Sequence, residues 1–366
     1  MRFLVDPDTV SRYTPGARSE SVMERYGLSE VVKLASNEYP LPPLPGVAEA
    51  VTAAVSRLNR YPDSGAQALR DALGRRLQAP PERVTIGNGS LEILLLLGEA
   101  LLAPGVEVVF PDPSFALYRR MCDLHGARPV AVPLREHRHD LEAMAAAVSP
   151  DTSLIILCNP NNPTGTYMPA AEIAGFCDRV PRDVLVVIDE AYNEFVTAPD
   201  SQDTLELARS RENVCVTRTF SKIHGLCALR VGYALAGEQV IAAIDTFRQP
   251  FNVNLLAQEA AVEALRHDDE VARRQALNAE LRDELAERLR AMGLPVLPSQ
   301  ANFVLVDLGG LPVPEGEACE RLASLGAIVR DGAAFGLPGW ARVSVGTRKE
   351  IEFFLEKLAL VAASTV

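Results

Sequence analysis

Lysine is rare in this chain. Only four of its 36 basic residues are lysine, and all the others are arginine. Arginine is effectively always protonated, whereas a partly buried lysine can lose its proton and attack a carbonyl to form a Schiff base. One of the four, Lys222, lies in the mostly apolar stretch 220–236. We therefore predict that Lys222 performs chemistry that arginine cannot perform.

The chain of 366 residues also lacks paired cysteines and an excess of positive charge. Its six cysteines include no C-x-x-C pair, and scattered cysteines in a chain of this length indicate reduced thiols of a cytosolic protein. No two His or Cys pairs combine at zinc-ligand spacing, so we predict no metal site. The net charge of −12 argues against nonspecific binding of nucleic acid, which needs clustered positive charge.

No long hydrophobic run is present. The most apolar segment, residues 91–102, contains Glu92 and Glu99 and is too short to cross a bilayer. Asp6 lies where a secretory signal peptide needs an apolar run. We therefore expect a cytoplasmic protein that has no membrane or nucleic-acid partner.

The middle of the chain alternates short β-rich runs with longer helical patterns. Such alternation is typical of an α/β domain with a mostly parallel sheet flanked by helices, and its ligand site lies at the carboxyl ends of the strands. The helical patterns cover residues 91–102, 170–177 and 255–265. The predicted strands are residues 83–86, 108–110, 129–132, 154–158, 184–188, 214–217 and 231–234.

The pattern changes near residue 269. A long charged helix over 270–292 precedes further strand and helix patterns, which are 302–306, 315–325, 327–329, 342–345 and a closing helix from Arg348. The first 40 residues contain too little apolar sequence for a core of their own. We therefore predict a large α/β domain over 41–268 and a smaller, discontinuous α+β domain formed by 1–40 and 269–366.

Four motifs follow predicted strands. Residues 87–90 (GNGS) open a helix, and such a turn offers backbone N–H groups to a phosphate, although it also fits an ordinary strand-to-helix turn. Residues 159–165 (NPNNPTG) contain two X-Pro steps, which present an Asn amide rigidly at a strand end. Residues 189–192 (DEAY) place a carboxylate at the end of an apolar strand, which is costly unless the carboxylate meets a cation or caps the next helix.

The fourth motif, residues 219–230, supplies two hydroxyls, an amine and a guanidinium within twelve residues. A phosphate-bearing carbonyl cofactor would use all of these groups. The hydroxyls and Arg230 suit its phosphate, and Lys222 suits its aldehyde.

The order and spacing of these motifs resemble the fold-type I pyridoxal-phosphate aminotransferases of class I/II. Within that class they resemble the histidinol-phosphate aminotransferases and their aromatic relatives. The resemblance covers essentially the whole chain. It rests on residues 13–16 (YTPG), 34–38 (LASNE), 60–63 (RYPD), 162–165 (NPTG), 221–222 (SK) and 342–347 (RVSVGT).

The resemblance assigns the catalytic groups. It implies that Lys222 binds pyridoxal 5′-phosphate as a Schiff base and later moves a proton. Asp189 would pair with the pyridine nitrogen and keep the ring an electron sink. Asn162 and Tyr192 would hydrogen-bond the phenolic oxygen, and Phe115 matches the aromatic residue that stacks on the ring.

The resemblance also implies a phosphate site. Its members would be the backbone around Ser90 and Leu91 and the side chains of Thr219, Ser221 and Arg230. Leu91 replaces an Asp that is frequent in the family, so one side-chain contact is lost and backbone donation remains.

Tyr61 matches a residue that reaches the phosphate from the other subunit, which implies a homodimer with two shared sites. On the substrate side, the resemblance implies binding by Tyr13, Asn37, Arg330 and Arg342. The two arginines suit a bidentate grip on a carboxylate or phosphate.

The implied reaction is a two-step, ping-pong transamination with histidinol phosphate as amino donor and 2-oxoglutarate as acceptor, in histidine biosynthesis. Residues 38–45 (EYPLPPLP) resemble the aromatic relatives as much, so an aromatic amino acid such as phenylalanine is the alternative donor. Another reaction on the same cofactor, such as decarboxylation or oxidation, also fits the motifs. A non-catalytic module of a transcription regulator would need a DNA-binding domain ahead of Tyr13.

Overall fold

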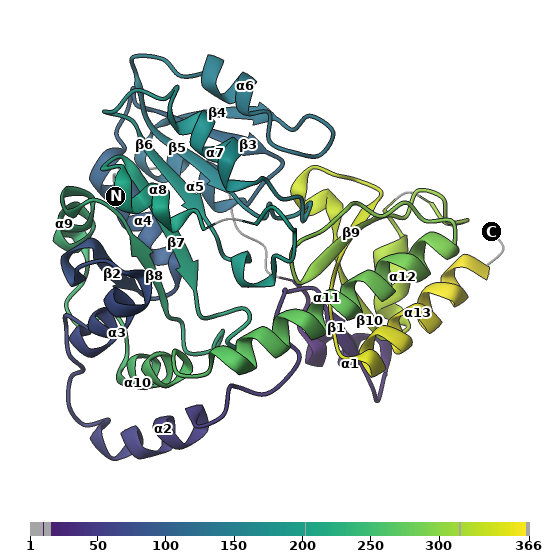
Figure 1. The fold of residues 1–366 in the computed structure, drawn as a ribbon. Coiled ribbons are helices and arrows are strands. Elements are labelled where there is room, and N and C mark those ends of the chain that lie inside the picture. Colours follow the sequence, from purple (N-terminus) through teal and green to yellow (C-terminus); the bar gives the residue numbers. More distant parts are fainter. Residues whose placement is uncertain (1–9, 11–15, 202, 315, 364–366) are drawn as a thin grey trace, which may run out of the picture.

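The structure, a computed structural model, describes residues 10, 16–201, 203–314 and 316–363. Two sheets lie side by side in it, each with its own helices and its own buried core (Figure 1). Tyr13, a predicted substrate-binding residue, lies outside the described residues.

A seven-stranded sheet forms the larger body, in the order β2-β8-β7-β6-β5-β3-β4. Every strand except β8 runs in the same direction, so the predicted mostly parallel sheet is confirmed. All seven predicted strands are present. They are β2 (Val84–Gly87), β3 (Glu107–Asp112), β4 (Arg128–Pro133), β5 (Thr152–Cys158), β6 (Leu185–Asp189), β7 (Val214–Thr219) and β8 (Gly232–Leu235).

Helices cover both faces of this sheet (Figure 1). One face packs against α4 (Ser90–Leu101), α5 (Leu117–His125) and α9 (Glu238–Phe247). The opposite core includes α2 (Val47–Ala54), α3 (Gln67–Leu77), α6 (Leu141–Ala146), α7 (Ala170–Cys177), α8 (Leu205–Ser210) and α10 (Leu255–Ala264). Because both faces are buried, the strands are nearly continuous apolar runs, and polar groups gather where the strands end.

A four-stranded sheet forms the smaller body, in the order β1-β10-β11-β9. Its strands are β1 (Val32–Leu34), β9 (Phe303–Asp307), β10 (Ala327–Asp331) and β11 (Trp340–Ser344), and its helices are α1 (Ser19–Tyr26), α11 (Asp268–Ala291), α12 (Ala318–Ser324) and α13 (Arg348–Ala363). The N-terminal β1 pairs in parallel with β10, which lies almost 300 residues further along the chain. The domain bounds 41–268 and 1–40 with 269–366 remain a prediction.

Helix α11 extends from beside the larger body into the smaller one (Figure 1). It begins at Asp268 with three acidic residues in its first turn, where they complement the helix dipole. The side chain of Arg274 on this helix donates to the carbonyl of Ile223 at 2.9 Å and to that of Pro42 at 2.7 Å. The chain segment next to Lys222 is therefore tied to the element that joins the two bodies.

Short 3₁₀ turns complete the secondary structure; they are η1 (Val55–Arg57), η2 (Pro81–Arg83), η3 (Asn193–Phe195) and η4 (Gly332–Phe335). The helix expected over 315–325 is shorter than predicted and begins at Ala318, because Pro314 and Gly316 disfavour helix at its start. Among the described residues, no helix is both long and apolar enough to cross a membrane.

The core of the smaller body provides a test of the fold. Leu285 on α11 is fully buried there, so Leu285→Ala should lower the free energy of unfolding by about 2–5 kcal/mol through the cavity it leaves. Urea denaturation measures the loss. Leu360 on α13 is 50% exposed, and Leu360→Ala should change stability by less than about 0.5 kcal/mol. Equal losses in the two variants would contradict the packing described.

Candidate active site

A cavity of about 800 Å³ lies where β5, β6 and β7 end and α4 begins. The last residue of each strand (Cys158, Asp189 and Thr219) and the first residue of the helix (Ser90) line it. Twelve of the predicted site residues meet in this cavity: Asn37, Ser90, Leu91, Phe115, Asn162, Asp189, Tyr192, Thr219, Ser221, Lys222, Arg230 and Arg342. The expected position at the carboxyl edge of the sheet is therefore what the structure shows.

Two predicted residues lie outside the cavity walls. Arg330 is the cross-strand partner of Arg342 in the smaller sheet, and its guanidinium lies 5.6 Å from the ring centroid of Phe335. The ring of Tyr61 is stacked on Phe251 with centroids 4.6 Å apart, and the residue is 82% exposed. Tyr61 therefore does not contribute to the cavity of its own chain.

Lys222 has an environment that favours the neutral amine. Its Nζ donates to the backbone carbonyl of Asn37 at 3.2 Å and lies 5.4 Å from the ring centroid of Tyr192. Burial, and then the positive charge of Arg342, lower the pKa of Lys222 to about 8. More of this amine is therefore neutral near pH 8 than would be the case for an ordinary lysine, and the neutral amine is the form that can attack a carbonyl.

Asn37 connects Lys222 with the smaller sheet. It adopts the left-handed conformation with φ of 51°, which asparagine tolerates better than most residues. Its carbonyl also accepts from Asn302 at 3.1 Å, and its Oδ1 accepts from Ser344 at 3.0 Å. Its Nδ2 donates to the hydroxyl of Tyr192 at 3.1 Å. Sequence reasoning missed Asn302 and Ser344, because their contacts join segments that are remote in the chain.

Asp189 and Glu190 face opposite sides of the sheet, as adjacent residues at a strand end do. Asp189 lines the cavity and accepts from the hydroxyl of Tyr118 at 2.8 Å and from that of Thr217 at 3.3 Å. Burial raises the pKa of Asp189, and these two hydrogen bonds oppose the rise. The fully buried Glu190 instead pairs with Arg218 at 2.8 Å. Of the two carboxylates, Glu190 is the one that meets the expected cation.

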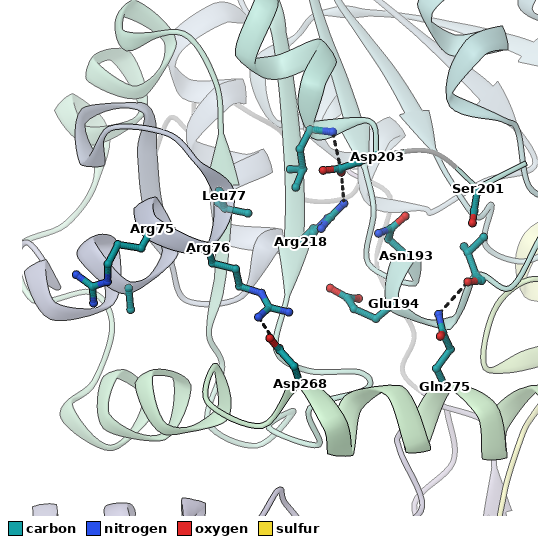
Figure 2. Close-up of a pocket in the computed structure, with 13 residues that line it drawn as sticks. Arg75, Arg76, Leu77, Asn193, Glu194, Ser201, Asp203, Arg218, Asp268 and Gln275 are labelled. Carbon is teal, nitrogen blue, oxygen red and sulfur yellow. Dashed lines mark hydrogen bonds and ion pairs between the residues drawn. The ribbon is translucent and has the colours of Figure 1, made fainter.

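Arg218 also lines a second cavity, of about 840 Å³ (Figure 2). Ion pairs join charged groups in its walls, with Arg76 bound to Asp268 and Arg218 lying 3.4 Å from Asp203. Burial raises the pKa of Glu194 in the same wall to about 6. None of the predicted site residues lines this cavity.

The start of α4 forms an anion site. Its N-cap residue is Gly89, which has no side chain to cap the helix, so the first N–H groups remain available. The guanidinium of Arg230 donates to Ser221 Oγ at 3.2 Å. It also lies close to Gly89, because a side chain at that position would place its Cβ only 2.7 Å from Nη2 of Arg230. A Cβ on Gly232 would come within 2.4 Å of the Ser90 nitrogen. These close approaches bring helix N–H groups, a hydroxyl and a cation together, which suits a phosphate.

Arg342 and Asn162 orient each other at the far wall. Nη1 of Arg342 donates to Asn162 Oδ1, and Nη2 donates to the carbonyl of Ala35 at 2.9 Å. Because the amide oxygen of Asn162 accepts from Arg342, its amide nitrogen is the group that can donate to a ligand. The peptide bonds Asn159–Pro160 and Asn162–Pro163 in this loop are cis.

Seven further residues line the cavity without having been predicted. Arg120 and Leu95 lie outside the predicted motifs, and the others lie within two residues of a predicted motif or site residue. The seven are Ser36, Leu95, Ala116, Leu117, Arg120, Cys158 and Ala191.

The donor set fits pyridoxal phosphate. It combines an anion site at a helix N-terminus, an amine of lowered pKa, a buried carboxylate, an aromatic side chain and two hydrogen-bonding groups in one cavity at the edge of a mostly parallel sheet. Fold and site together define a pyridoxal-phosphate-dependent transferase of fold type I.

Comparison with known proteins narrows the class. The sequence profile of the family "Aminotransferase class I and II" matches residues 29–358. The chain belongs to this family and is a pyridoxal-phosphate-dependent aminotransferase.

Several relatives of the chain are histidinol-phosphate aminotransferases. The chain is 43% identical to the histidinol-phosphate aminotransferase of Moorella thermoacetica, over 97% of this chain and 92% of that protein. It is 44% identical to the enzyme of the same name from Anaeromyxobacter sp., over 98% of this chain and 99% of that protein. The crystal structure of histidinol-phosphate aminotransferase from Sinorhizobium meliloti in complex with pyridoxal-5′-phosphate superposes with a TM-score of 0.86 and 28% identity, over 95% of each chain.

The lowered pKa of Lys222 predicts how the cofactor-free protein captures its cofactor. The neutral amine is the nucleophile, so the rate of capture should rise with pH and level off above a midpoint near 8, rather than near the ordinary lysine value of 10.5. Stopped-flow absorbance after addition of pyridoxal phosphate measures this rate. Lys222→Arg is the control and should show no capture, because arginine keeps its proton. A rate that still climbs steeply at pH 10 would contradict the assignment.

Proposed function

We propose that the enzyme transfers the amino group of histidinol phosphate to 2-oxoglutarate in two half-reactions. The observation that carries the choice of substrate is the lining of the cavity by Arg120 and Arg342 in addition to Arg230. Arg230 is assigned to the cofactor phosphate, and Arg120 and Arg342 add positive charge to the cavity wall, which suits substrate anions. Histidinol phosphate carries a dianionic phosphate where phenylalanine carries a single carboxylate, and 2-oxoglutarate carries a second carboxylate that a phenyl side chain lacks. The names of the relatives support the same choice.

The proposed cofactor site uses the predicted residues. Lys222 attaches the cofactor through Nζ, and Asp189 accepts from the ring nitrogen. The backbone of Ser90 and Leu91 binds the phosphate. The side chains of Thr219, Ser221 and Arg230 bind it as well. When bound, pyridoxal phosphate supplies a ring that withdraws electrons from the substrate Cα.

The remaining roles concern orientation and proton transfer. The amide nitrogen of Asn162 and the hydroxyl of Tyr192 donate to the phenolic oxygen, and the ring of Phe115 packs on the cofactor face. Nζ of Lys222 takes the proton from the substrate Cα and returns it at C4′. Its pKa of about 8 suits this exchange, because a proton carrier works best when its pKa lies near the operating pH.

The substrate side of the site draws on the smaller body. Arg342 binds the anionic end of the substrate, with Asn37 and Arg330 beside it, and Tyr13 is assigned to the same group by family resemblance. Arg342 is held in place by Asn162 and by the carbonyl of Ala35, so its guanidinium is already oriented before substrate binds.

We propose that the active unit is a homodimer in which Tyr61 reaches the phosphate site of the partner. Tyr61 and Phe251 form an exposed aromatic pair, which is unusual on a surface without a partner. Asn252 follows Phe251 directly, and its Nδ2 donates at 2.6 Å to Glu92 in the first turn of α4. The pair therefore lies beside the helix that begins at the anion site. A cytoplasmic location is part of the same proposal and agrees with six free thiols.

Steady-state kinetics test the substrate. With 2-oxoglutarate as acceptor, kcat/KM for histidinol phosphate should exceed that for phenylalanine by about 100-fold or more, because the arginines of the cavity bind a dianionic phosphate more strongly than the single carboxylate of phenylalanine. Lys222→Ala is the control and should lose both turnover and the visible absorbance of the bound cofactor.

Three outcomes would contradict the proposed reaction. Absence of turnover with histidinol phosphate would exclude the donor. Release of CO₂ or consumption of O₂ without transfer of nitrogen would replace transamination by another reaction. A protein that stays colourless after addition of pyridoxal phosphate would exclude the cofactor site.

Subunit complementation tests the shared site. Lys222→Ala and Tyr61→Ala chains are each expected to have low activity as homodimers. In a mixed dimer, one site combines Lys222 from one chain with Tyr61 from the other and is complete. After subunit exchange, activity should therefore rise to about a quarter of the wild-type value, since half of the dimers are mixed and each has one intact site. If Tyr61 acted within its own chain, mixing would restore nothing.

A further inference from the structure

Tyr118 is a fully buried residue to which the family resemblance assigns no role. It lies at the start of α5, and its hydroxyl donates to Asp189 Oδ2 at 2.8 Å. The other carboxylate oxygen accepts from Thr217 at the longer distance of 3.3 Å. Tyr118 does not line the cavity, so it acts on the site through residues that do, among them Asp189.

The ring of Tyr118 is fixed by packing. It meets Phe115 edge-on, with centroids 5.8 Å apart and an interplanar angle of 88°, and it meets Phe110 at 6.3 Å. Phe115 lines the cavity and lies only three residues earlier. The same segment therefore supplies the aromatic face of the site and the hydrogen bond behind its carboxylate, so both are positioned together.

The hydrogen bonds to Asp189 come from neutral donors, and they favour its ionised form. Two hydroxyls face Asp189, that of Tyr118 from α5 and that of Thr217 from β7, together with the backbone N–H of Ala191. The thiol of Cys158 also faces it, because Cys158 on β5 is the cross-strand partner of Asp189. This thiol hydrogen-bonds Tyr118 as well. Glu190, the sequence neighbour of Asp189, is turned away and paired with Arg218. Tyr118 is the closer of the two hydroxyl donors, so its hydrogen bond favours the ionised form of Asp189 more strongly than that of Thr217 does.

Loss of that donor would make the carboxylate more basic. A more basic Asp189 would take the proton of any group that donates to it, and the pair would become neutral, as a dry site favours. In the proposed cofactor site the group that donates to Asp189 is the ring nitrogen. The position of that proton decides how strongly the ring withdraws electrons.

We infer that Tyr118 is a positioning residue. Its hydroxyl orients Asp189 and favours the ionised form of the carboxylate, so that the proton shared with the cofactor stays on the ring nitrogen. This inference rests on the proposed function, in which Asp189 accepts from that nitrogen.

The test is Tyr118→Phe in the holoenzyme, which keeps the packed ring and removes only the hydroxyl. With cofactor labelled with ¹⁵N in the ring, the ¹⁵N NMR resonance should move from the protonated toward the unprotonated position. The value of kcat should fall about ten- to a hundredfold, the range expected for loss of a hydrogen bond to a charged group, while KM changes little.

Two further variants calibrate the result. Thr217→Val removes the longer hydrogen bond to Asp189 and should shift the resonance in the same direction by less. Tyr233→Phe makes the matched change at a buried tyrosine of β8 whose hydroxyl interacts with Arg218, and it should leave resonance and kcat unchanged. If Tyr118→Phe does not fold, as judged by circular dichroism, site-specific replacement of Tyr118 by 4-aminophenylalanine decides the question, because it keeps the size of the side chain and offers a weaker donor, so the resonance should shift in the same direction by less.

The outcomes distinguish a failure of the role inferred for Tyr118 from a failure of the role proposed for Asp189. A wild-type ring nitrogen that is unprotonated, or a protein that binds no cofactor, would overturn the proposed role of Asp189. A protonated wild-type nitrogen with an unchanged resonance in Tyr118→Phe, or in the 4-aminophenylalanine variant when that variant decides, would overturn only the role of Tyr118. A graded shift, larger in Tyr118→Phe than in Thr217→Val, supports it.

Discussion

The burial of a carboxylate at the end of β6 is the constraint on which the site depends. Both faces of the large sheet are covered by helices, so polar groups are tolerated only where the strands end. Asp189 and Glu190 lie at that point, and each needs its own partners from other elements. Arg218 on β7 neutralises Glu190, and hydroxyls from α5 and β7 satisfy Asp189. The order of the strands is thus tied to the electrostatics of the cavity.

The second organising interaction is the junction at Asn37. This residue precedes the large sheet in sequence, yet its backbone and side chain contact Ser344 and Asn302 of the smaller body and Tyr192 of the larger one. The amine of Lys222 donates to its carbonyl. A displacement of the smaller body would therefore change the hydrogen bond of the Lys222 amine directly. The two bodies are joined by one hydrogen-bonded network at the cavity.

Much of the fold and the site followed from sequence patterns, for identifiable physical reasons. Strands buried on both faces are continuous apolar runs, so all seven large-sheet strands were predictable. Groups at the carboxyl ends of parallel strands converge, so motifs around Asp189 and Lys222 could be placed together. By contrast, the sequence did not predict the roles of Tyr118 and Arg218. A tyrosine on the apolar face of a helix is typical of a core residue, and an arginine directly after a predicted strand is typical of a surface residue. Their roles depend on which side of a strand or helix faces the cavity.

The sequence by itself determined the residue types that the chemistry needs. Its single lysine in an apolar context, its glycine-rich turn and its proline-bounded asparagine are local features, because each is set by the properties of a side chain or by a few backbone angles. Only the tertiary structure decided which carboxylate meets a cation and which meets hydroxyls, because adjacent residues on a strand point to opposite faces. It also decided that Asn37 and Arg342, some 300 residues apart, share a cavity with Lys222. Such contacts arise from strand order and packing, which no local pattern encodes.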